Sequence, residues 1–224
     1  MAVTDEAILK VKDMIVTGAL APGDRLPPEK ELSESLGLSR SSLREAVKAL
    51  EFIHVLDVRR GDGTYVTSLE PQLLLEAMTF VVDIHQDSSI LELFAVRRLL
   101  EPAAAAMAAT IATPEDIGQL RAILDEVDER ASIESLVAHD KSFHHFINNL
   151  PGNAYLSSLL DGISSNTMRA RVWRGFSEEH TVERTLREHK AILDALELGD
   201  AELARSAAIM HISGVEQWLR NAAS

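Results

Sequence analysis

The sequence contains no cysteine and no long apolar run, and each absence excludes a class of protein. Without cysteine, the 224-residue chain forms neither disulfides nor thiolate metal sites, so any metal must be bound by histidine and carboxylate side chains. No stretch approaches about 18 consecutive apolar residues, so no membrane-spanning helix is expected. The N-terminus lacks a basic start followed by an apolar block, which argues against a secretory signal. We therefore expect a soluble, cytoplasmic protein with no membrane partner.

Basic residues are outnumbered by acidic ones, and the formal net charge of −13 at first argues against a nucleic-acid partner. The charge is unevenly distributed, however. Residues 69–224 carry 13 Lys and Arg against 24 Asp and Glu, whereas residues 1–68 carry 9 against 11. Within residues 38–60 the balance is +2. Because the Debye length at physiological salt is only about 8 Å, a locally basic face on an acidic protein can still bind DNA phosphates.

Residues 1–68 predict three helices followed by a β-hairpin. Thr4 and Ser39 are suited to cap the first and third helices, and Pro28 stands near the start of the second. Gly37 separates the second helix from the third. The short β-like runs "VLDV" and "TYV" are joined by the glycine-rich turn "RRGDG".

The remainder of the chain predicts an all-α bundle. Residues 69–88 form a linker, in which "PQLLLEAMTFVV" predicts a connecting helix. Residues 89–224 contain about six helical patterns, one of them over residues 154–173, with breaks that include "PGN", "GFSEE" and "LGD". The alanine-rich run 103–109 is expected at a close helix crossing. The predicted fold class is therefore mainly α, with a helix–turn–helix and hairpin at residues 1–68 and a helical bundle at residues 89–224.

A helix–turn–helix followed by a hairpin is a DNA-binding module, because the second helix of the pair enters the major groove and presents its N-terminal side chains to base edges. Arginine can form a bidentate hydrogen bond to guanine, and serine can form hydrogen bonds to bases or phosphates. The hairpin turn would form a wing whose glycine backbone approaches the DNA closely. The side chains at the start of the third helix are Ser39, Arg40, Ser41, Ser42 and Arg44.

The stretch "PGDRLPPEKELSESLGLSRSSLREAVKALE", continued by "VRRGDGTYV", resembles the winged-helix domain of GntR-type transcription regulators. A chance helix–turn–helix pattern in another α protein would account for "LGLSRSSLRE" alone but not for the wing as well. Two departures are Lys30, where arginine is usual, and His54, where a turn glycine is usual. The resemblance implies DNA contacts at Lys30, Arg40, Arg44 and Gly61, with Ser39, Ser41 and Ser42 nearby.

The bundle sequence contains an aspartate and three histidines in a pattern that suits a metal. Asp140 and His144 are four residues apart and so share one face of a helix, while His189 and His211 stand among apolar residues of two later helices. A lone core histidine is usually satisfied by one hydrogen bond. Three of them with an aspartate would be costly to bury unless they shared a ligand. Three nitrogens and one oxygen suit Zn, Ni or Mn, with positions left open for water or a ligand oxygen.

Three stretches in this region resemble the FCD effector domain of the FadR-like GntR subgroup: "LELFAVRRLLEPAAAAMAA", "DKSFHHFINNLPGN" and "REHKAILDALELGDAELARSAAIMHI". In the metal-dependent members, the ligand pattern is D-x-x-x-H followed by two later histidines. The resemblance therefore implies one divalent metal per chain, Zn before Ni or Mn, bound by Asp140, His144, His189 and His211. It also implies a small carboxylate effector held near the metal; other members lack the metal and bind an acyl-CoA.

The remaining histidines and three polar side chains complete the candidate residues. His139 and His145 stand about 100° of helix off the ligand face, so we expect them to face solvent or to support the ligands rather than to bind metal. We assign no role to His54, His85 or His180. Candidate effector contacts are Arg97, Asn166 and Arg171; for Arg97 the alternative is an ion pair with Glu101, and for the other two an ordinary helix edge.

The sequence thus predicts a ligand-responsive repressor rather than an enzyme, acting as a homodimer on a palindromic double-stranded operator. Two alternatives stay open. In the first, the protein is still a regulator, but the metal is structural or is itself the signal. In the second, the protein is a metal-dependent hydrolase, since a metal with open positions activates water. No further Glu, Ser or Lys motif supplies a base for such a hydrolase, and it would leave the DNA-binding region unexplained.

Overall fold

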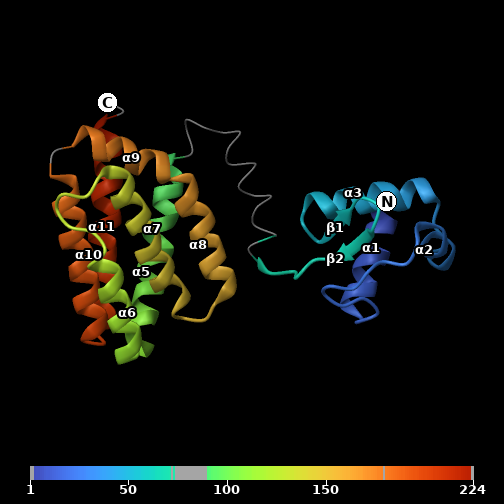
Figure 1. Ribbon diagram of the computed structural model, residues 1–224, viewed down its shortest axis with the longest axis horizontal. Helices are drawn as coiled ribbons and strands as arrows, with labels where there is room; N and C mark the ends of the chain where they lie inside the picture. Colours follow the sequence, from blue (N-terminus) through green and yellow to red (C-terminus); the bar gives the residue numbers. More distant parts are fainter. Residues whose placement is uncertain (1–2, 72, 74–89, 179, 223–224) are drawn as a thin grey trace. The chain divides into compact units, whose positions relative to one another are not determined.

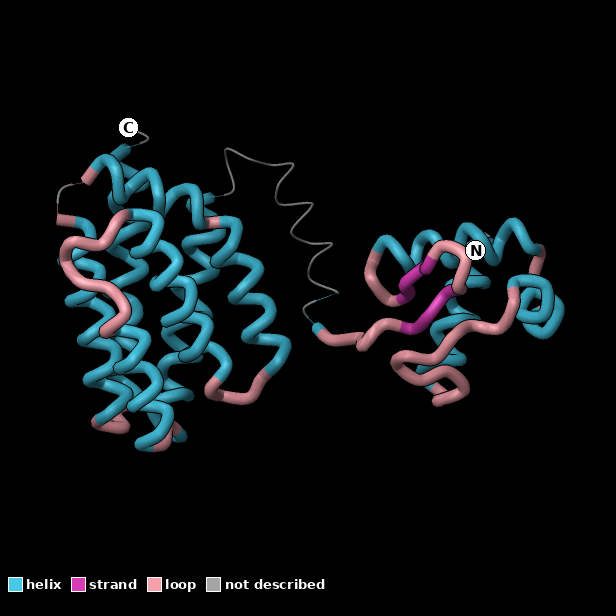
Figure 2. Tube along the Cα trace, in the orientation of Figure 1, coloured by secondary structure: helices cyan, strands magenta, loops and turns pink. Residues whose placement is uncertain are grey.

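The computed structural model describes residues 3–71, 73, 90–178 and 180–222, and the chain divides into two compact units, residues 1–80 and 81–224. Each unit is described by itself, with elements numbered as in Figure 1. Most of the predicted linker 69–88, including its connecting helix and His85, lies outside the described residues. The mainly α fold class predicted from the sequence is confirmed, and helices dominate both units in Figure 2.

The described part of the N-terminal unit, up to residue 66, contains three helices and a two-stranded sheet, in the predicted order. Its elements are α1 (Val3–Val16), α2 (Glu29–Leu36), α3 (Arg40–Phe52), β1 (Leu56–Arg59) and β2 (Gly63–Val66). The strands are antiparallel, with Leu56 opposite Val66 and Arg59 opposite Gly63. Leucines and valines from all five elements form one core, which includes Val11, Leu32, Leu43, Leu56 and Val66.

The helix–turn–helix has well-defined ends. Gly37 ends α2 in the left-handed conformation with φ of 64°, a backbone state that glycine adopts at least cost. Two residues later Ser39 caps α3, as predicted, by accepting a hydrogen bond from the backbone nitrogen of Ser42. Thr4 does not act as a cap, because α1 already begins at Val3. Pro28 precedes α2 as its capping residue rather than standing inside its first turn.

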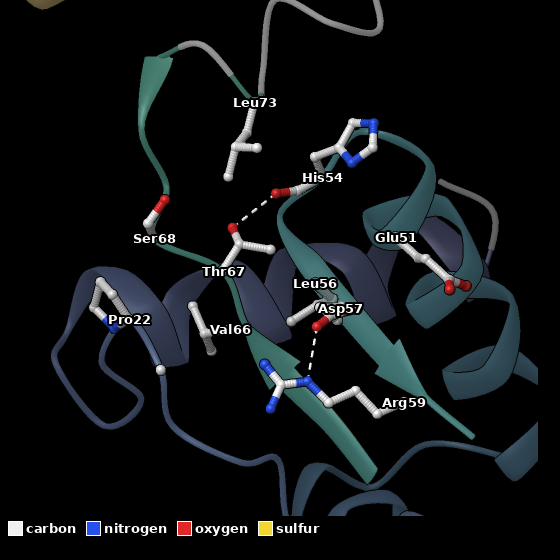
Figure 3. A pocket seen from close by; sticks show the side chains of 11 residues that line it. Pro22, Glu51, His54, Leu56, Asp57, Arg59, Val66, Thr67, Ser68 and Leu73 are labelled. Carbon is white, nitrogen blue, oxygen red and sulfur yellow. Dashed lines mark hydrogen bonds and ion pairs between the residues drawn. The ribbon is translucent and has the colours of Figure 1, made fainter. Parts of the chain in front are cut away.

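The start of the hairpin tolerates the histidine that replaces the usual glycine. His54 adopts φ of 57°, the left-handed region, and its carbonyl accepts a 2.7 Å hydrogen bond from the hydroxyl of Thr67. Both residues line a pocket of this unit, beside the Asp57–Arg59 ion pair (Figure 3). The hairpin therefore begins where the sequence predicts it, although the turn that precedes its first strand contains a histidine in place of a glycine.

The C-terminal unit is a bundle, and its described residues, 90–178 and 180–222, form seven helices, one more than predicted. They are α5 (Ile90–Ile111), α6 (Pro114–Leu124), α7 (Ile133–Asn149), α8 (Ala154–Asn166), α9 (Met168–Ser177), α10 (Thr181–Glu197) and α11 (Ala201–Ala222). The single helix expected over residues 154–173 is in fact α8 followed by α9. Thr167 separates them, and its buried hydroxyl bonds to the carbonyl of Ser164 and to the guanidinium of Arg97.

The bundle core is built on small side chains where α5 and α11 cross. These two helices form the most extensive helix pair of the unit and lie side by side along their length (Figure 1). Ala105 and Ala108 of α5 are buried with Ala204 and Ala208 of α11 in one cluster. Alanine allows two backbones to approach closely, which agrees with the crossing expected at residues 103–109.

Candidate metal site and DNA-binding surface

Four buried side chains from three helices converge inside the bundle. Asp140 and His144 stand one turn apart on α7, His189 comes from α10 and His211 from α11. One ligand atom from each lies within 4.8 Å of all the others. These four residues are the metal ligands predicted from the sequence, and together they can hold a metal ion.

The converging atoms are one carboxylate oxygen and three imidazole nitrogens. Oδ1 of Asp140 lies 3.4 Å from Nε2 of His189 and 3.7 Å from Nε2 of both His144 and His211. Nε2 of His189 is completely buried and has no hydrogen-bond partner among the described residues. A buried polar atom without a partner is costly, and a divalent ion at the centre of the group would satisfy it. The donor set therefore fits the metal that the sequence implies.

The other nitrogen of each imidazole is also engaged. Nδ1 of His144 lies 3.2 Å from the Glu101 carboxylate, and Nδ1 of His211 lies 2.8 Å from that of Glu188. Nδ1 of His189 is 3.1 Å from the ring of His139. Such outer contacts orient the ring of a metal-binding histidine and select the nitrogen that faces the metal. Glu188 was missed from the sequence, because a glutamate on an amphipathic helix carries no signal that separates this role from a solvated one.

His139 and His145 have different environments, although both flank the ligand face of α7. His139 is buried, with 3% of its surface exposed, which corrects the part of our expectation that allowed it to face solvent. His145 is exposed and pairs with Asp161 at 2.8 Å. The difference arises because α7 packs against α5, α6, α8, α9 and α10, so more than one of its faces is buried.

Burial sets the protonation of the cluster. It lowers the pKa of His144 to about 3 and holds the pKa of His189 well below its usual range. Burial alone would raise the pKa of Glu101, but Arg97, by its charge and its hydrogen bond, together with smaller contributions from His144 and Arg171, lowers that pKa to about 2. Near neutral pH, His144 and His189 are therefore uncharged, as metal ligands must be, while Glu101 is ionised.

The three candidate effector residues occupy different positions. Arg97 is 1% exposed and forms the ion pair with Glu101 that the sequence offers as its alternative role. Arg171 is buried, pairs with Oδ2 of Asp140, and donates to the carbonyl of Ser164 at 2.6 Å. Burial lowers the pKa of Arg171 to about 9, so it stays charged near neutral pH. Asn166 is half-buried at the end of α8.

A small cavity lies beside the cluster and contains an arginine that the sequence analysis missed. Asp140, Arg171 and His211 line it together with Arg174, which is 3% exposed. The guanidinium of Arg174 bonds to Glu178 through Nε, but its Nη2 has no partner among the described residues. For the stretch "RARVWR" the sequence offered Arg171 as an effector contact, with an ordinary helix edge as the alternative, and did not single out Arg174. Helical phase alone does not distinguish a charged edge from a buried pair of cations.

The predicted DNA-contacting residues gather at the start of α3, on α2 and at the hairpin turn. All of them are exposed except the half-buried Ser42. Arg44 pairs with Glu29 at 2.8 Å, so a DNA contact would replace that partner. The side chains concerned are Lys30, Ser39, Arg40, Ser41, Ser42 and Arg44, with the backbone of Gly61 at φ of 79°.

The wing is held to the rest of its unit by Arg25, which the sequence analysis did not single out. Its guanidinium bonds to the carbonyl of Asp62, and its backbone forms a bridge to Tyr65. A Cβ at Gly63 would collide with this guanidinium. Gly63, at φ of 151°, leaves room for this close approach, and Arg25 contacts the turn that contains Gly61 from outside the hairpin.

Comparison with protein-family models matches residues 92–214 to the FCD domain and residues 3–66 to the bacterial regulatory proteins of the gntR family. The HTH-type transcriptional regulator LutR of Bacillus subtilis is 31% identical over 212 residues, which cover 92% of this chain and 96% of that protein. The galactonate operon transcriptional repressor of Escherichia coli is 30% identical over 223 residues, covering 97% and 96%.

Solved structures agree with these matches. The Streptococcus agalactiae GntR structure superposes with a TM-score of 0.69 at 26% identity and covers 96% of this chain and 99% of its own. Escherichia coli McbR/YncC, at a TM-score of 0.55 and 21% identity over the whole of both chains, supports the fold alone.

Fold and comparisons together define a ligand-responsive, DNA-binding transcription regulator rather than an enzyme. The chain belongs to the GntR family of bacterial regulatory proteins, with an FCD domain as in the FadR-like subgroup. In the parts of the chain that are described, no helix has the length and apolar character needed to cross a membrane.

Acid is expected to destabilise the metal-free bundle. The pKa of His144 is about 3 against an ordinary 6.5, and that of Glu101 about 2 against 4.5, so the unfolded chain binds more protons than the folded one. Stability is then full above about pH 6.5 and falls as the pH is lowered towards 3. Urea unfolding in the presence of a chelator measures this, and tryptophan emission reports the bundle alone because Trp173 and Trp218 both lie in it.

The variant His144→Gln serves as the comparison, because it removes one of the groups whose pKa is lowered by folding. Its stability is expected to depend less steeply on pH between 6.5 and 4. A wild-type bundle whose urea midpoint stays constant over that interval would contradict the assignment of these protonation states.

Proposed function

We propose that the protein is a metal-dependent transcription repressor that a small carboxylate metabolite releases from its operator. The observation that carries this proposal is the buried Nε2 of His189, which has no hydrogen-bond partner in the described part of the chain and lies 3.4 Å from Oδ1 of Asp140. Residues 1–68 would bind DNA, residues 89–224 would bind the metal and effector, and residues 69–88 would link them. The protein would act in the cytoplasm, where a regulator meets its DNA.

Asp140, His144, His189 and His211 would hold one divalent ion per chain. Three imidazoles and one carboxylate favour Zn, with Ni or Mn as further candidates. When bound, such an ion accepts carboxylate oxygens at its open coordination positions. Arg171, already paired with Asp140, supplies a cation beside the site, and Arg174 supplies a second one on the same cavity.

Arg97 and Asn166 are assigned lesser parts in effector binding. Arg97 is committed to Glu101 and Thr167, so it would act by holding the carboxylate that faces His144. Asn166 stands at the α8–α9 junction next to Thr167, where an amide side chain can reach a ligand that enters between these helices. A ligand in the cavity favours one of two conformational states of the regulator by differential affinity, which is how it would weaken operator binding.

DNA binding would use the start of α3 and the wing. Arg40 and Arg44 would fork onto guanine or phosphate, with Lys30, Ser39, Ser41 and Ser42 contacting the backbone and Gly61 bringing the wing close to the DNA. Both arginines are exposed at the end of the helix that enters the major groove in this class of module.

Apolar surface on α5 and α11 supports a homodimer. Val96, Leu99 and Met107 recur at helical spacing on α5 and are between 37% and 70% exposed. Leu203 and Met210 lie seven residues apart on α11 and are 45% and 72% exposed. Exposed apolar groups on two adjacent helices are typical of a protein interface. A two-fold dimer presents two α3 helices, which matches a palindromic operator.

Arg44→Ala is expected to weaken operator binding by about tenfold or more, because a good base contact is worth about 1–3 kcal/mol. A gel-shift titration on the DNA upstream of the protein's own gene measures this. Lys190→Ala is the control, since it removes the same charge from an exposed position on α10. Metal binding should be unchanged in both variants, and wild-type DNA affinity in Arg44→Ala would exclude the proposed contact.

The dimer is tested by introducing charge into the exposed apolar surface. Leu99→Glu combined with Met210→Glu should convert a dimer to a monomer in analytical ultracentrifugation, because an unpaired buried carboxylate opposes association. Leu198→Glu is the matched control, as Leu198 is 73% exposed but follows α10. A double variant that remains dimeric would place the interface elsewhere.

The effects of the metal and of the effector on stability can be distinguished by measuring the melting temperature. A chelator should lower the melting temperature, Zn should restore it, and members of a panel of small carboxylates should raise it further only in the metal-loaded protein. His189→Ala should respond to neither metal nor carboxylate while its N-terminal unit stays folded.

The other outcomes of this experiment distinguish the alternatives. A response to metal without any response to carboxylates would make the metal structural or the signal itself. A response to carboxylates in the chelated protein would place the effector away from the metal, and no response to metal would refute the metal site.

A further inference from the structure

His139 stands next to a proposed metal ligand but makes contacts of its own. Its side chain lies among α6, α7 and α10, and each ring nitrogen has one partner. Nδ1 lies 3.1 Å from the carbonyl oxygen of Ile123, in the last turn of α6, and Nε2 lies 3.1 Å from Nδ1 of His189. The imidazole thus bridges a backbone carbonyl of one helix and a candidate ligand of another.

The chemistry of these partners fixes the direction of both hydrogen bonds. A carbonyl oxygen only accepts, so Nδ1 of His139 carries the hydrogen. In a neutral ring Nε2 then accepts, and Nδ1 of His189 must donate to it. A neutral His189 with its hydrogen on Nδ1 presents a bare lone pair at Nε2, and Nε2 is the atom without a partner that faces Asp140.

The orientation of the His189 ring is held by a second contact. Phe143 stacks on it with ring centroids 4.2 Å apart and an angle of 9° between the planes. Phe143 restricts the plane of the ring, but an aromatic face cannot distinguish Nδ1 from Nε2. The hydrogen bond to His139 does distinguish them, because it places the hydrogen of His189 on Nδ1.

His189 differs in this respect from the other two histidines. His144 and His211 have a carboxylate at Nδ1, from Glu101 and Glu188 respectively. His189 instead has a neutral imidazole backed by a carbonyl, so its support adds no charge to the cluster. The relay also connects the end of α6 to the centre of the site.

We propose that His139 is a positioning residue that fixes the tautomer of His189 and so leaves Nε2 of His189 free for the metal. The tautomer follows from hydrogen bonds within the metal-free chain, whereas its use for metal binding rests on the metal site proposed above. Loss of such a supporting contact typically costs about 10- to 100-fold in metal affinity.

The first test uses nitrogen-15 NMR of the histidine rings in the intact, metal-free protein near neutral pH. Wild-type His189 should show a hydrogen on Nδ1 and a bare Nε2. In His139→Leu, which removes the acceptor, the hydrogen should move at least partly to Nε2, where Asp140 can accept it. A wild-type His189 that carries its hydrogen on Nε2, or on both nitrogens, would overturn the proposal.

The second test measures Zn affinity by competition with a chelator. His139→Leu should bind Zn about 10- to 100-fold more weakly, and His139→Gln, whose amide can both donate to Ile123 and accept from His189, should recover most of the loss. His145→Leu is the matched control, because it removes an exposed histidine from the same helix. Wild-type affinity in His139→Leu would refute the positioning role.

The two tests separate the two proposals. If the wild-type protein shows the expected tautomer but binds no Zn, the metal site fails while the relay from Ile123 to His189 stands. If the wild-type protein binds Zn but His189 shows the other tautomer, the metal site stands and the role of His139 fails. Should His139→Leu not fold, the wild-type tautomer and the His139→Gln affinity still decide the matter.

Discussion

The bundle depends on how the buried carboxylate of Asp140 is compensated. A buried, ionised carboxylate is tolerated only when it is paired. Its Oδ2 pairs with Arg171 from α9, while its Oδ1 faces imidazoles from α7, α10 and α11. One side chain thereby makes four helices interdependent. The outer carboxylates Glu101 and Glu188 extend the same polar network to α5 and again to α10.

The local sequence pattern was sufficient to predict those features whose contacts lie within one helix or one turn. The spacing of Asp140 and His144, the cap at Ser39 and the wing turn all follow from residues a few positions apart, and the structure has each of them. His189 and His211 were selected because histidines among apolar residues are expensive to bury, and they do meet Asp140. Their function as ligands stays a prediction.

The features that the local sequence pattern did not predict depend on contacts between helices that are distant in sequence. His139 was placed by its helical phase off the ligand face, but α7 is surrounded by five other helices, so phase does not determine burial there. Thr167 divides the expected 154–173 helix through hydrogen bonds to Ser164 and to Arg97, a partner 70 positions away. Glu188 and Arg174 are charged residues on amphipathic helices, and only the fold shows that they face inwards.

The donor set of the cluster has a consequence for what the regulator is able to sense. Three imidazoles and one carboxylate contain no sulfur, and the whole chain lacks cysteine. Thiolate sites lose their metal when the sulfur is oxidised, but these four side chains take no part in thiol–disulfide exchange. The metal proposed for this site would therefore be bound without a thiolate ligand, so that thiol oxidation could not release it.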